Sequence, residues 1–225
     1  MRRIALDTET TGLNPIEGHR VVEIGCVELD NNIPTGKEWH TYLNPERSMP
    51  EAALAVHGLD DNFLSDKPLF KDISLEFLNF IEGAELVIHN ARFDIGFLNN
   101  ELNLVNLPII NIEEAIDTVQ LARQTIPGAA ASLEALCKRF NIDLSQRGKH
   151  GALLDAQLLA EVYLELTGGR QVSLVLNQTS KNLDPANKVK IESKDLNYVV
   201  AAVTKEEDEQ HQKMLQKIKE PIWLK

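Results

Sequence analysis

Acidic side chains stand inside two segments that are otherwise apolar, and this placement restricts how the chain can fold. Asp7 and Glu9 follow the apolar residues 4–6, and Asp155 lies within the apolar segment 152–159. Alternate side chains of a strand project to the same face, so Asp7 and Glu9 would lie side by side and repel each other. A carboxylate that faces a core without a partner is costly. The fold must therefore expose these groups to solvent or bring a cation to them.

Two further residues indicate the same kind of site. Asp94 follows the apolar strand candidate 86–88, although an aspartate at this place is also favoured by a helix dipole. His150 precedes Asp155 by five residues, a spacing that does not stack on one helical face, so it would approach from a loop. Mg²⁺ and Mn²⁺ prefer oxygen ligands. Carboxylates with one neutral histidine suit phosphodiester hydrolysis with two cations about 4 Å apart, the imidazole taking a proton from the attacking water.

The order of the predicted elements favours an α/β fold. Strand-like segments come first, and helical segments then alternate with short strands, which predicts a mixed sheet with helices on its faces. Residues 31–36 are turn-forming types, so the second and third strands are expected to form an antiparallel hairpin. The predicted strands are 3–7, 20–30, 37–43, 86–88 and 115–117, and the predicted helices are 50–56, 69–81, 93–102, 118–125, 133–140 and 152–166.

The composition of the chain changes after Gly169. Most of segment 170–190 is polar and without periodicity, which is typical of a flexible linker. Segment 191–225 regains apolar residues and includes a charged helix candidate at 205–219, but it is too short to build a core of its own. We therefore divide the chain into a domain of residues 1–169, the linker, and a short tail that binds a partner.

Charge and cysteine content exclude several classes of protein. The chain has 23 Lys and Arg against 34 Asp and Glu, a net charge of −11, so an overall basic footprint for nucleic acid is absent. A phosphate-binding protein can still be acidic where bound cations supply positive charge. Cys26 and Cys137 lie far apart in apolar contexts, which favours reduced, buried thiols. No run reaches the ~18 apolar residues of a membrane span, and we expect a cytoplasmic protein.

Three motifs together resemble those of a known family. They are Asp7-x-Glu9 with the Thr-Thr-Gly-Leu that follows, residues 89–94 (His-Asn-Ala-Arg-Phe-Asp) and residues 150–156 (His-Gly-Ala-x-x-Asp-Ala). In this order, with these acids and this histidine, they resemble the three motifs of the DEDDh 3′–5′ exonuclease superfamily. Within it, the chain resembles the family of epsilon (proofreading) subunits of bacterial DNA polymerase III. The resemblance covers residues 1–169.

The resemblance implies a ribonuclease H-like fold, with a mixed five-stranded sheet flanked by helices, and a site for two divalent cations, Mg²⁺ or Mn²⁺. By position, Asp7, Glu9 and Asp155 would hold the cations directly. Asp94 would complete the acidic set as a further metal and catalytic residue. His150 would be the general base of the reaction.

The resemblance also implies contacts with the substrate. His57 matches a residue that touches the sugar or phosphate of the terminal nucleotide, and Glu51 is the nearest upstream glutamate for a second contact. The metal-binding residues Asp7, Glu9 and Asp155 would lie against the same nucleotide.

The activity that the resemblance implies is proofreading. The protein would remove mispaired 3′-terminal nucleotides from the single-stranded or frayed end of a DNA primer and release nucleoside 5′-monophosphates. Residues 191–225 would dock on the polymerase alpha subunit, and residues 171–176 resemble a sliding-clamp-binding peptide, with a short strand or a sticky linker as the alternative. Two other functions stay open: a related exonuclease that acts on RNA or in DNA repair, and a non-catalytic subunit for polymerase assembly.

Overall fold

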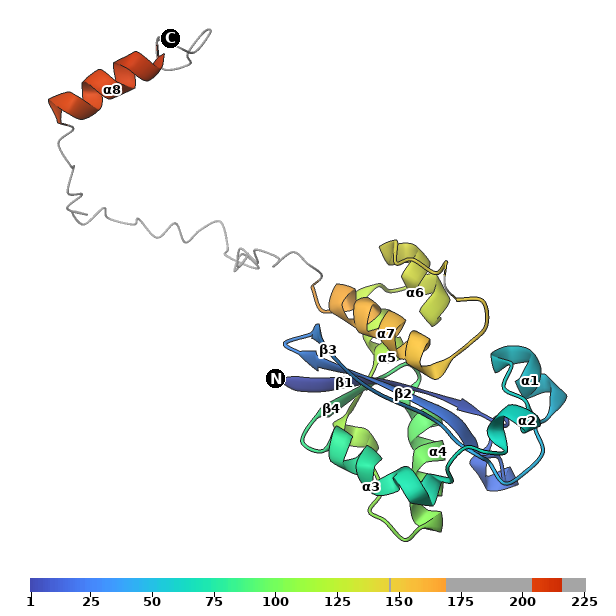
Figure 1. The fold of residues 1–225 in the computed structure, drawn as a ribbon. Coiled ribbons are helices and arrows are strands. Elements are labelled where there is room, and N and C mark those ends of the chain that lie inside the picture. The colour runs from blue at the N-terminus through green and yellow to red at the C-terminus, as the bar shows by residue number, and fades with distance from the viewer. Residues whose placement is uncertain (146, 169–203, 216–225) are drawn as a thin grey trace, which may run out of the picture. The chain divides into compact units, whose positions relative to one another are not determined.

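The structure is a computed structural model that describes residues 1–145, 147–168 and 204–215 (Figure 1). The chain forms two units, Met1–Leu174 and Val175–Lys225, and each is described by itself. Every element that positions the candidate site belongs to the first unit. None of the helices in the described ranges combines the length and the apolar character that a bilayer-spanning helix needs.

A mixed five-stranded sheet forms the centre of the first unit, as predicted. Its strands are β1 (Arg2–Thr10), β2 (Val21–Asp30), β3 (Ile33–Tyr42), β4 (Glu85–Ile88) and β5 (Ala115–Asp117). Their order is β3-β2-β1-β4-β5, in which β2 is antiparallel to β1 and β3 while β4 is parallel to β1 and β5. The carboxyl ends of β1, β4 and β5 therefore meet at one edge of the sheet, which is where sites commonly lie in such folds.

The hairpin between β2 and β3 is tighter than the sequence suggests. We expected a turn over residues 31–36, but β3 already begins at Ile33. Asn31 and Asn32 have positive φ angles of 49° and 69°. Two-residue hairpin turns require this conformation, and asparagine tolerates it. The two asparagines therefore make the turn alone, and the strand starts earlier.

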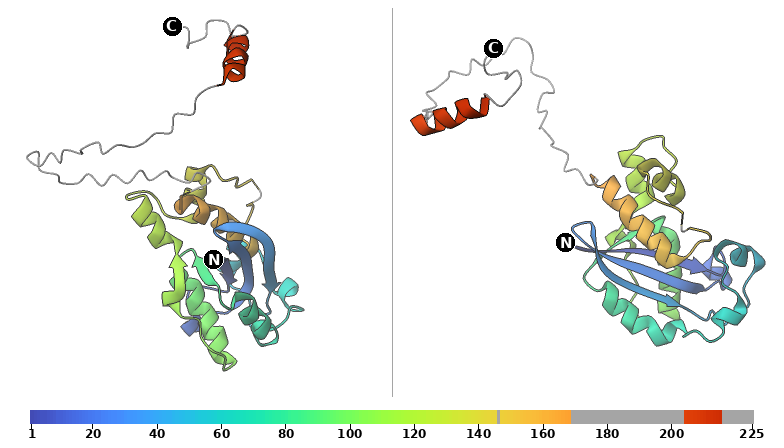
Figure 2. Two further views of the ribbon diagram at one scale, coloured as in Figure 1. Left: turned by 90° about the vertical axis from the view of Figure 1, so that its left-hand side faces the viewer. Right: turned by 45° about the horizontal axis from the view of Figure 1, so that its top comes forward.

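Helices cover both faces of the sheet (Figures 1 and 2). One face carries α3 (Phe70–Ile81) and α4 (Ala91–Leu104), and the other carries α5 (Thr118–Thr125), α6 (Leu133–Phe140) and α7 (Ala152–Leu166). The shorter helices are α1 (Glu51–His57), α2 (Asp61–Leu64), η1 (Pro15–Glu17) and η2 (Ile112–Glu114). The sequence predicts the longer helices and α1, but not α2, η1 or η2, because a single turn shows no apolar period.

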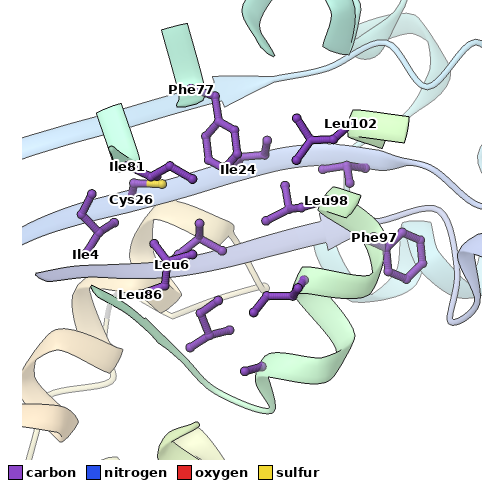
Figure 3. Close-up of a cluster of buried hydrophobic side chains, with 14 of the residues drawn as sticks. Ile4, Leu6, Ile24, Cys26, Phe77, Ile81, Leu86, Phe97, Leu98 and Leu102 are labelled. Atoms are coloured by element: carbon purple, nitrogen blue, oxygen red, sulfur yellow. The ribbon is translucent and has the colours of Figure 1, made fainter. Parts of the chain in front are cut away.

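The core is divided between the two faces of the sheet by the alternation of side chains along the strands. In β1, Ile4 and Leu6 pack against α3 and α4, whereas Ala5 packs on the other face with α5, α6 and α7. Figure 3 shows the first of these layers, which includes Cys26. Cys26 and Cys137 are both buried and free, as predicted, and burial raises the pKa of each thiol.

Of the predicted tail, the structure describes one helix. It is α8 (Lys205–Leu215), which lies within the charged segment 205–219 predicted as helical. The linker 170–190 and the peptide 171–176 fall outside the described residues. The proposed division into domain, linker and tail stays a prediction.

The first turn of α7 lies directly on the backbone of β2 at Gly25. An ideal Cβ at Gly25 would be 2.3 Å from the backbone nitrogen of Leu153 and 2.4 Å from the carbonyl carbon of Ala152. Real Cβ atoms essentially never come so close to backbone, so this contact requires glycine. Gly25 is the register partner of Asp7. The missing side chain therefore lets α7 begin beside the acidic end of β1.

We expect Gly25→Ala to destabilise the protein by about 1–3 kcal/mol or more, because α7 or β2 must move to admit the methyl group. Urea unfolding monitored by circular dichroism measures the change. Gly96→Ala in α4 is the matched control, since a Cβ at Gly96 meets nothing within 4 Å. Alanine is favoured over glycine inside a helix by ~1 kcal/mol, so the control should be at least as stable as the parent. Equal stability of the two variants would contradict the close contact.

Candidate active site

Asp7 and Glu9 lie on β1 and face α7. Ala5 on the same strand belongs to the core layer of α5, α6 and α7, and alternation gives Asp7 and Glu9 this same face. β1 runs beyond its predicted end because it pairs with β2 as far as Thr10 and Val21. Regular strand geometry therefore holds both carboxylates, with Glu9 buried and Asp7 half-buried.

Asp155 comes from the first turn of α7 and is held by two neighbouring side chains. Arg147 donates from Nε to Oδ1 and from Nη2 to Oδ2 of Asp155, both at 2.8 Å. Nδ1 of His150 lies 3.2 Å from Oδ2 of Asp155 and 3.1 Å from Nη2 of Arg147. The two-pronged ion pair compensates the charge that an apolar helix would otherwise bury, and it raises the pKa of Arg147.

Asp94 reaches the site from the other face of the sheet. It lies in the first turn of α4, and Thr8 donates to its Oδ1 from the backbone nitrogen at 3.1 Å and from Oγ1 at 2.7 Å. Thr8 alternates with Asp7 and Glu9 along β1, so its side chain points towards α4. A favourable helix dipole alone does not explain Asp94, because the carboxylate is buried and bonded to the strand that carries the other acids.

The predicted catalytic and metal-binding side chains line one cavity of about 330 Å³. They are Asp7, Glu9, Asp94, His150 and Asp155. They come from β1, from α4, from the loop before α7 and from α7 itself. The structure therefore brings together the acids and the histidine that the sequence picked out in separate segments.

The carboxylates of this cavity are difficult to ionise together. Burial raises the pKa of Asp7 well above its usual value, and the charges of Asp94 and Glu9 raise it further. Burial also raises the pKa of Glu9 to about 8, with Glu23 as the strongest neighbouring contribution. The pKa of Asp94 rises to about 7, again because of burial, although hydrogen bonds from Thr8 oppose the rise. The site therefore favours any arrangement that adds positive charge.

The donor atoms of the site fit divalent cations. Glu9, His150 and Asp155 each place one possible ligand atom so that these atoms lie within 4.8 Å of one another. Asp7 and Asp94 line the same cavity and offer further carboxylate oxygens. Hard cations such as Mg²⁺ and Mn²⁺ prefer oxygen-rich sets of this kind, and a bound cation would relieve the repulsion that raises the pKa values.

A second cavity, of about 530 Å³ and mostly apolar, adjoins the first and shares Thr8, Glu9 and Phe93 with it. His57 lines this second cavity at the end of α1 and is buried. The backbone N–H of Leu59 donates to Nδ1 of His57 at 3.0 Å, so a neutral ring carries its proton on Nε2. Burial lowers the pKa of His57, and within the described residues its buried Nε2 has no hydrogen-bond partner. The ring thus offers a donor to a molecule in the cavity.

Glu51 lies apart from the other predicted residues. It is the first residue of α1, and its side chain is exposed. The residues of α1 that line the second cavity are Ala52, Ala53, Val56 and His57. The geometry gives no support to a contact of Glu51 with a nucleotide, and that contact stays a prediction.

Glu23 is a buried acid at the site that sequence reasoning missed. It lies on β2 directly opposite Glu9, and its Oε1 is 2.8 Å from Nε2 of His40 on β3. His89 was also not assigned a role; it lines the cavity, and its Nδ1 lies 2.9 Å from Oγ1 of Thr118. Alternation in the strand indicates that Glu23 could be inward-facing, but which residue of β1 it meets depends on the register of the strands.

Comparisons with families and solved structures define the class of protein. The exonuclease family model RNase_T matches residues 4–163. Exonuclease X, solved in complex with 5′ overhanging duplex DNA, has a TM-score of 0.56 and 28% identity over 74% of this chain and 90% of that chain. The nuclease domain of 3′hExo, a DEDDh family member bound to rAMP, has a TM-score of 0.64 over 74% of this chain and 91% of that chain. At 16% identity, it shows that the two proteins share a fold. The family model and the fold together are those of an exonuclease with a ribonuclease H-like fold.

Curated relatives narrow this class. DNA polymerase III subunit epsilon of Rickettsia prowazekii (strain Madrid E) is 49% identical over 97% of this chain and 97% of its own length. The subunit of the same name from Escherichia coli (strain K12) is 52% identical over 75% of this chain and 72% of its own length. This chain therefore belongs to the family of DNA polymerase III epsilon subunits, which confirms the resemblance seen in the motifs. It is a metal-dependent exonuclease, and its family implies divalent metal ions.

Without divalent cations, the protein should become less stable to unfolding as the pH rises. The pKa values of Glu9 and Asp94, about 8 and about 7, lie above their ordinary values of 4.5 and 3.8. Between these limits the folded state holds protons that the unfolded state has released, so the contribution of these groups to stability falls as the pH rises from about 4 to about 8.

Thermal unfolding in a chelator, repeated with Mg²⁺ and with Mn²⁺, measures this effect. We expect the melting temperature in chelator to fall relative to the metal-loaded protein as the pH is raised from about 5 to about 8. Groups outside the site titrate in both series, so the difference between the two curves is the quantity to compare. A difference that does not depend on pH would contradict the role given to these carboxylates.

Proposed function

We propose that this chain is the proofreading exonuclease of a DNA polymerase III and removes 3′-terminal nucleotides from DNA by hydrolysis, releasing nucleoside 5′-monophosphates. The observation that carries the proposal is the acidic cavity with its histidine, placed beside an apolar cavity of about 530 Å³. Relatives named DNA polymerase III subunit epsilon, at 42–53% identity, support DNA as the substrate. We place the activity in the cytoplasm, with the replicating chromosome.

In this proposal Asp7, Glu9 and Asp155 hold two divalent cations, Mg²⁺ or Mn²⁺, and Asp94 completes the set. The bound cations supply the positive charge that stabilises the attacking and leaving oxygens of an in-line displacement. The raised pKa values of Asp7, Glu9 and Asp94 support this assignment, because each marks a carboxylate that gains from a nearby positive charge.

His150 takes the proton of the attacking water. Its Nδ1 lies 3.1 Å from Nη2 of Arg147, which only donates hydrogen bonds, and 3.2 Å from Oδ2 of Asp155, which only accepts them. In the neutral ring one of the two nitrogens carries no proton and can accept that of the water. Half of the side chain is exposed, so the histidine can return the proton to solvent after each turnover.

The apolar cavity takes the terminal nucleoside. Leu13, Val56 and Phe93 line it and offer surfaces for a base and a sugar, and the buried Nε2–H of His57 donates to an oxygen of the sugar or phosphate. Glu9 lines both cavities, so a nucleotide seated here would place its phosphate against the acidic residues.

Single-turnover digestion of a DNA primer with a mispaired 3′ end tests the activity. We expect stepwise 3′ shortening with Mg²⁺ or Mn²⁺ and none in chelator. His150→Ala should lower the rate by about 10²–10⁴-fold because the general base is lost. Asp7→Asn should abolish metal-dependent cutting, and Asp66→Asn, which alters an exposed carboxylate of a loop, is the matched control and should leave the rate unchanged.

An RNA strand of the same sequence separates the alternatives. Rapid cutting of RNA with DNA spared would contradict a proofreading role and move the protein to RNA turnover. Cutting of neither strand would favour a non-catalytic assembly subunit.

We further propose that residues 191–225 dock on the polymerase alpha subunit and that residues 171–176 bind the sliding clamp. The relatives are named as subunits of DNA polymerase III, which supports membership of that complex. Segment 191–225 carries apolar residues and Trp223 in a stretch too short to bury them alone. Aromatic residues of this kind often anchor protein interfaces.

Truncation after Gly169 should abolish co-purification with the alpha subunit and leave exonuclease activity intact. Deletion of residues 171–176 alone should weaken capture by the clamp and leave capture by the alpha subunit unchanged, which separates the role of this peptide from that of the tail. Pull-down assays with the purified partners measure both effects. Loss of exonuclease activity on truncation would mean that the tail belongs to the nuclease fold.

A further inference from the structure

Two further cavities lead away from the active site. One, of about 300 Å³, shares Leu13 and Phe93 with the apolar cavity and is also lined by Asn90 and Arg92. The other, of about 580 Å³, shares Asn90 and Arg92 with it and extends to Arg123. The shared residues place these cavities next to one another between the active site and α5. We call the surface formed by Asn90, Arg92 and Arg123 the arginine track.

The arginines of this track are available to a ligand. Arg92 lies in the first turn of α4 and Arg123 in the last turn of α5, and both are exposed. Arg20 and Arg147, by contrast, are each held by a buried carboxylate. In the part of the chain that the structure describes, neither Arg92 nor Arg123 forms an ion pair.

The acids beside the track equal its arginines in number, but one of them is engaged by backbone hydrogen bonds. Asp117 lines the cavity, but its Oδ1 accepts hydrogen bonds from the backbone of Asn90 at 3.3 Å and of Val119 at 2.9 Å, the latter capping α5. Glu113 in η2 is exposed and is the remaining acid among the described lining residues. The lining therefore carries two arginines and two acids, and the arginines supply its cationic donors on a chain whose net charge is −11.

We propose that the arginine track binds backbone phosphates of the nucleic acid beyond its terminal nucleotide. The proposal rests on the exonuclease function proposed above. A polynucleotide whose last nucleotide occupies the apolar cavity must leave across an adjoining surface. The cavity that holds Asn90 and Arg92 shares Leu13 and Phe93 with the apolar cavity and so adjoins it. Guanidinium groups match phosphate geometry, and such contacts bind any base sequence.

The test compares substrates with and without an upstream backbone. The one-nucleotide substrate is the p-nitrophenyl ester of thymidine 5′-monophosphate, and the long substrates are a single-stranded oligonucleotide and a duplex with a frayed 3′ end. The variants are Arg92→Ala, Arg123→Ala and the double variant. Arg139→Ala is the matched control, because Arg139 is also exposed but lines none of the four cavities.

We expect the double variant to raise KM for the long substrates by roughly threefold to tenfold, with kcat little changed and hydrolysis of the ester unaffected. The slope of log KM against log salt for single strands should fall by about 0.7 for each arginine removed. Glu113→Gln should act in the opposite direction and lower KM. An effect on single strands assigns the phosphates to the strand that is cut, and an effect confined to the duplex assigns them to its complement.

Two results would overturn the track. The first is that the double variant has the same KM and kcat as Arg139→Ala on both long substrates. The second is that the double variant loses as much activity on the ester as on the long substrates, which would place the arginines in the reaction itself. Failure of the unaltered protein to cut the ester and the oligonucleotides alike would count against the proposed exonuclease function, so the two failures are distinguishable.

Discussion

The contact of α7 with the bare backbone of β2 at Gly25 sets the distance between the two halves of the active site. Asp7 is the register partner of Gly25, and Asp155 follows the contact residues Ala152 and Leu153 on α7. A side chain at position 25 would lift the helix and carry Asp155 away from β1. The loop before α7 leads into the helix, and its His150 donates a backbone hydrogen bond to the carbonyl of Val56 at 3.3 Å. One close packing contact thus brings Asp155 and His150 beside the acidic end of β1.

The distribution of charge around this contact is uneven. Asp155 has Arg147 as a close partner, and Glu23 has His40. Within the described ranges Asp7 and Glu9 form no ion pair, although both face the same cavity, and the pKa values of both are raised. Repulsion between them is tolerated because the core layers on both faces of the sheet hold β1 in place. The fold therefore keeps two carboxylates on one strand where a nearby positive charge would stabilise them.

Local patterns in the sequence predict much of this arrangement, whereas features that depend on pairing between distant segments escape them. The apolar periods of α3, α4 and α7 are local, as is the spacing of Asp7 and Glu9, and the structure agrees with each. The meeting of Glu23 with Glu9 depends on the register of two strands, and the bonds from Thr8 to Asp94 join residues 86 positions apart. Neither has a local signal.

Position matching has a related limit at Glu51. It was chosen as the nearest glutamate upstream of His57, yet its side chain is exposed at the start of α1. Each residue of a helix is rotated by about 100° from the one before, so nearness along the chain does not fix the side of the helix on which a residue lies, and a contact of Glu51 with a nucleotide stays a prediction.

In the proposed proofreading reaction, selection of mispaired ends requires no reading of base edges. The cavity assigned to the terminal nucleoside is mostly apolar, with Leu13 and Val56 in its lining, and such surfaces accept any base. A correctly paired terminus has to unpair before it can enter, which costs a few kcal/mol, and a mismatched terminus unpairs at a lower cost. Phosphate contacts along the arginine track are equal for both ends because they are independent of sequence. The preference for a mispaired end therefore arises from the pairing energy of the DNA, and the protein contributes a cavity that admits one unpaired nucleotide.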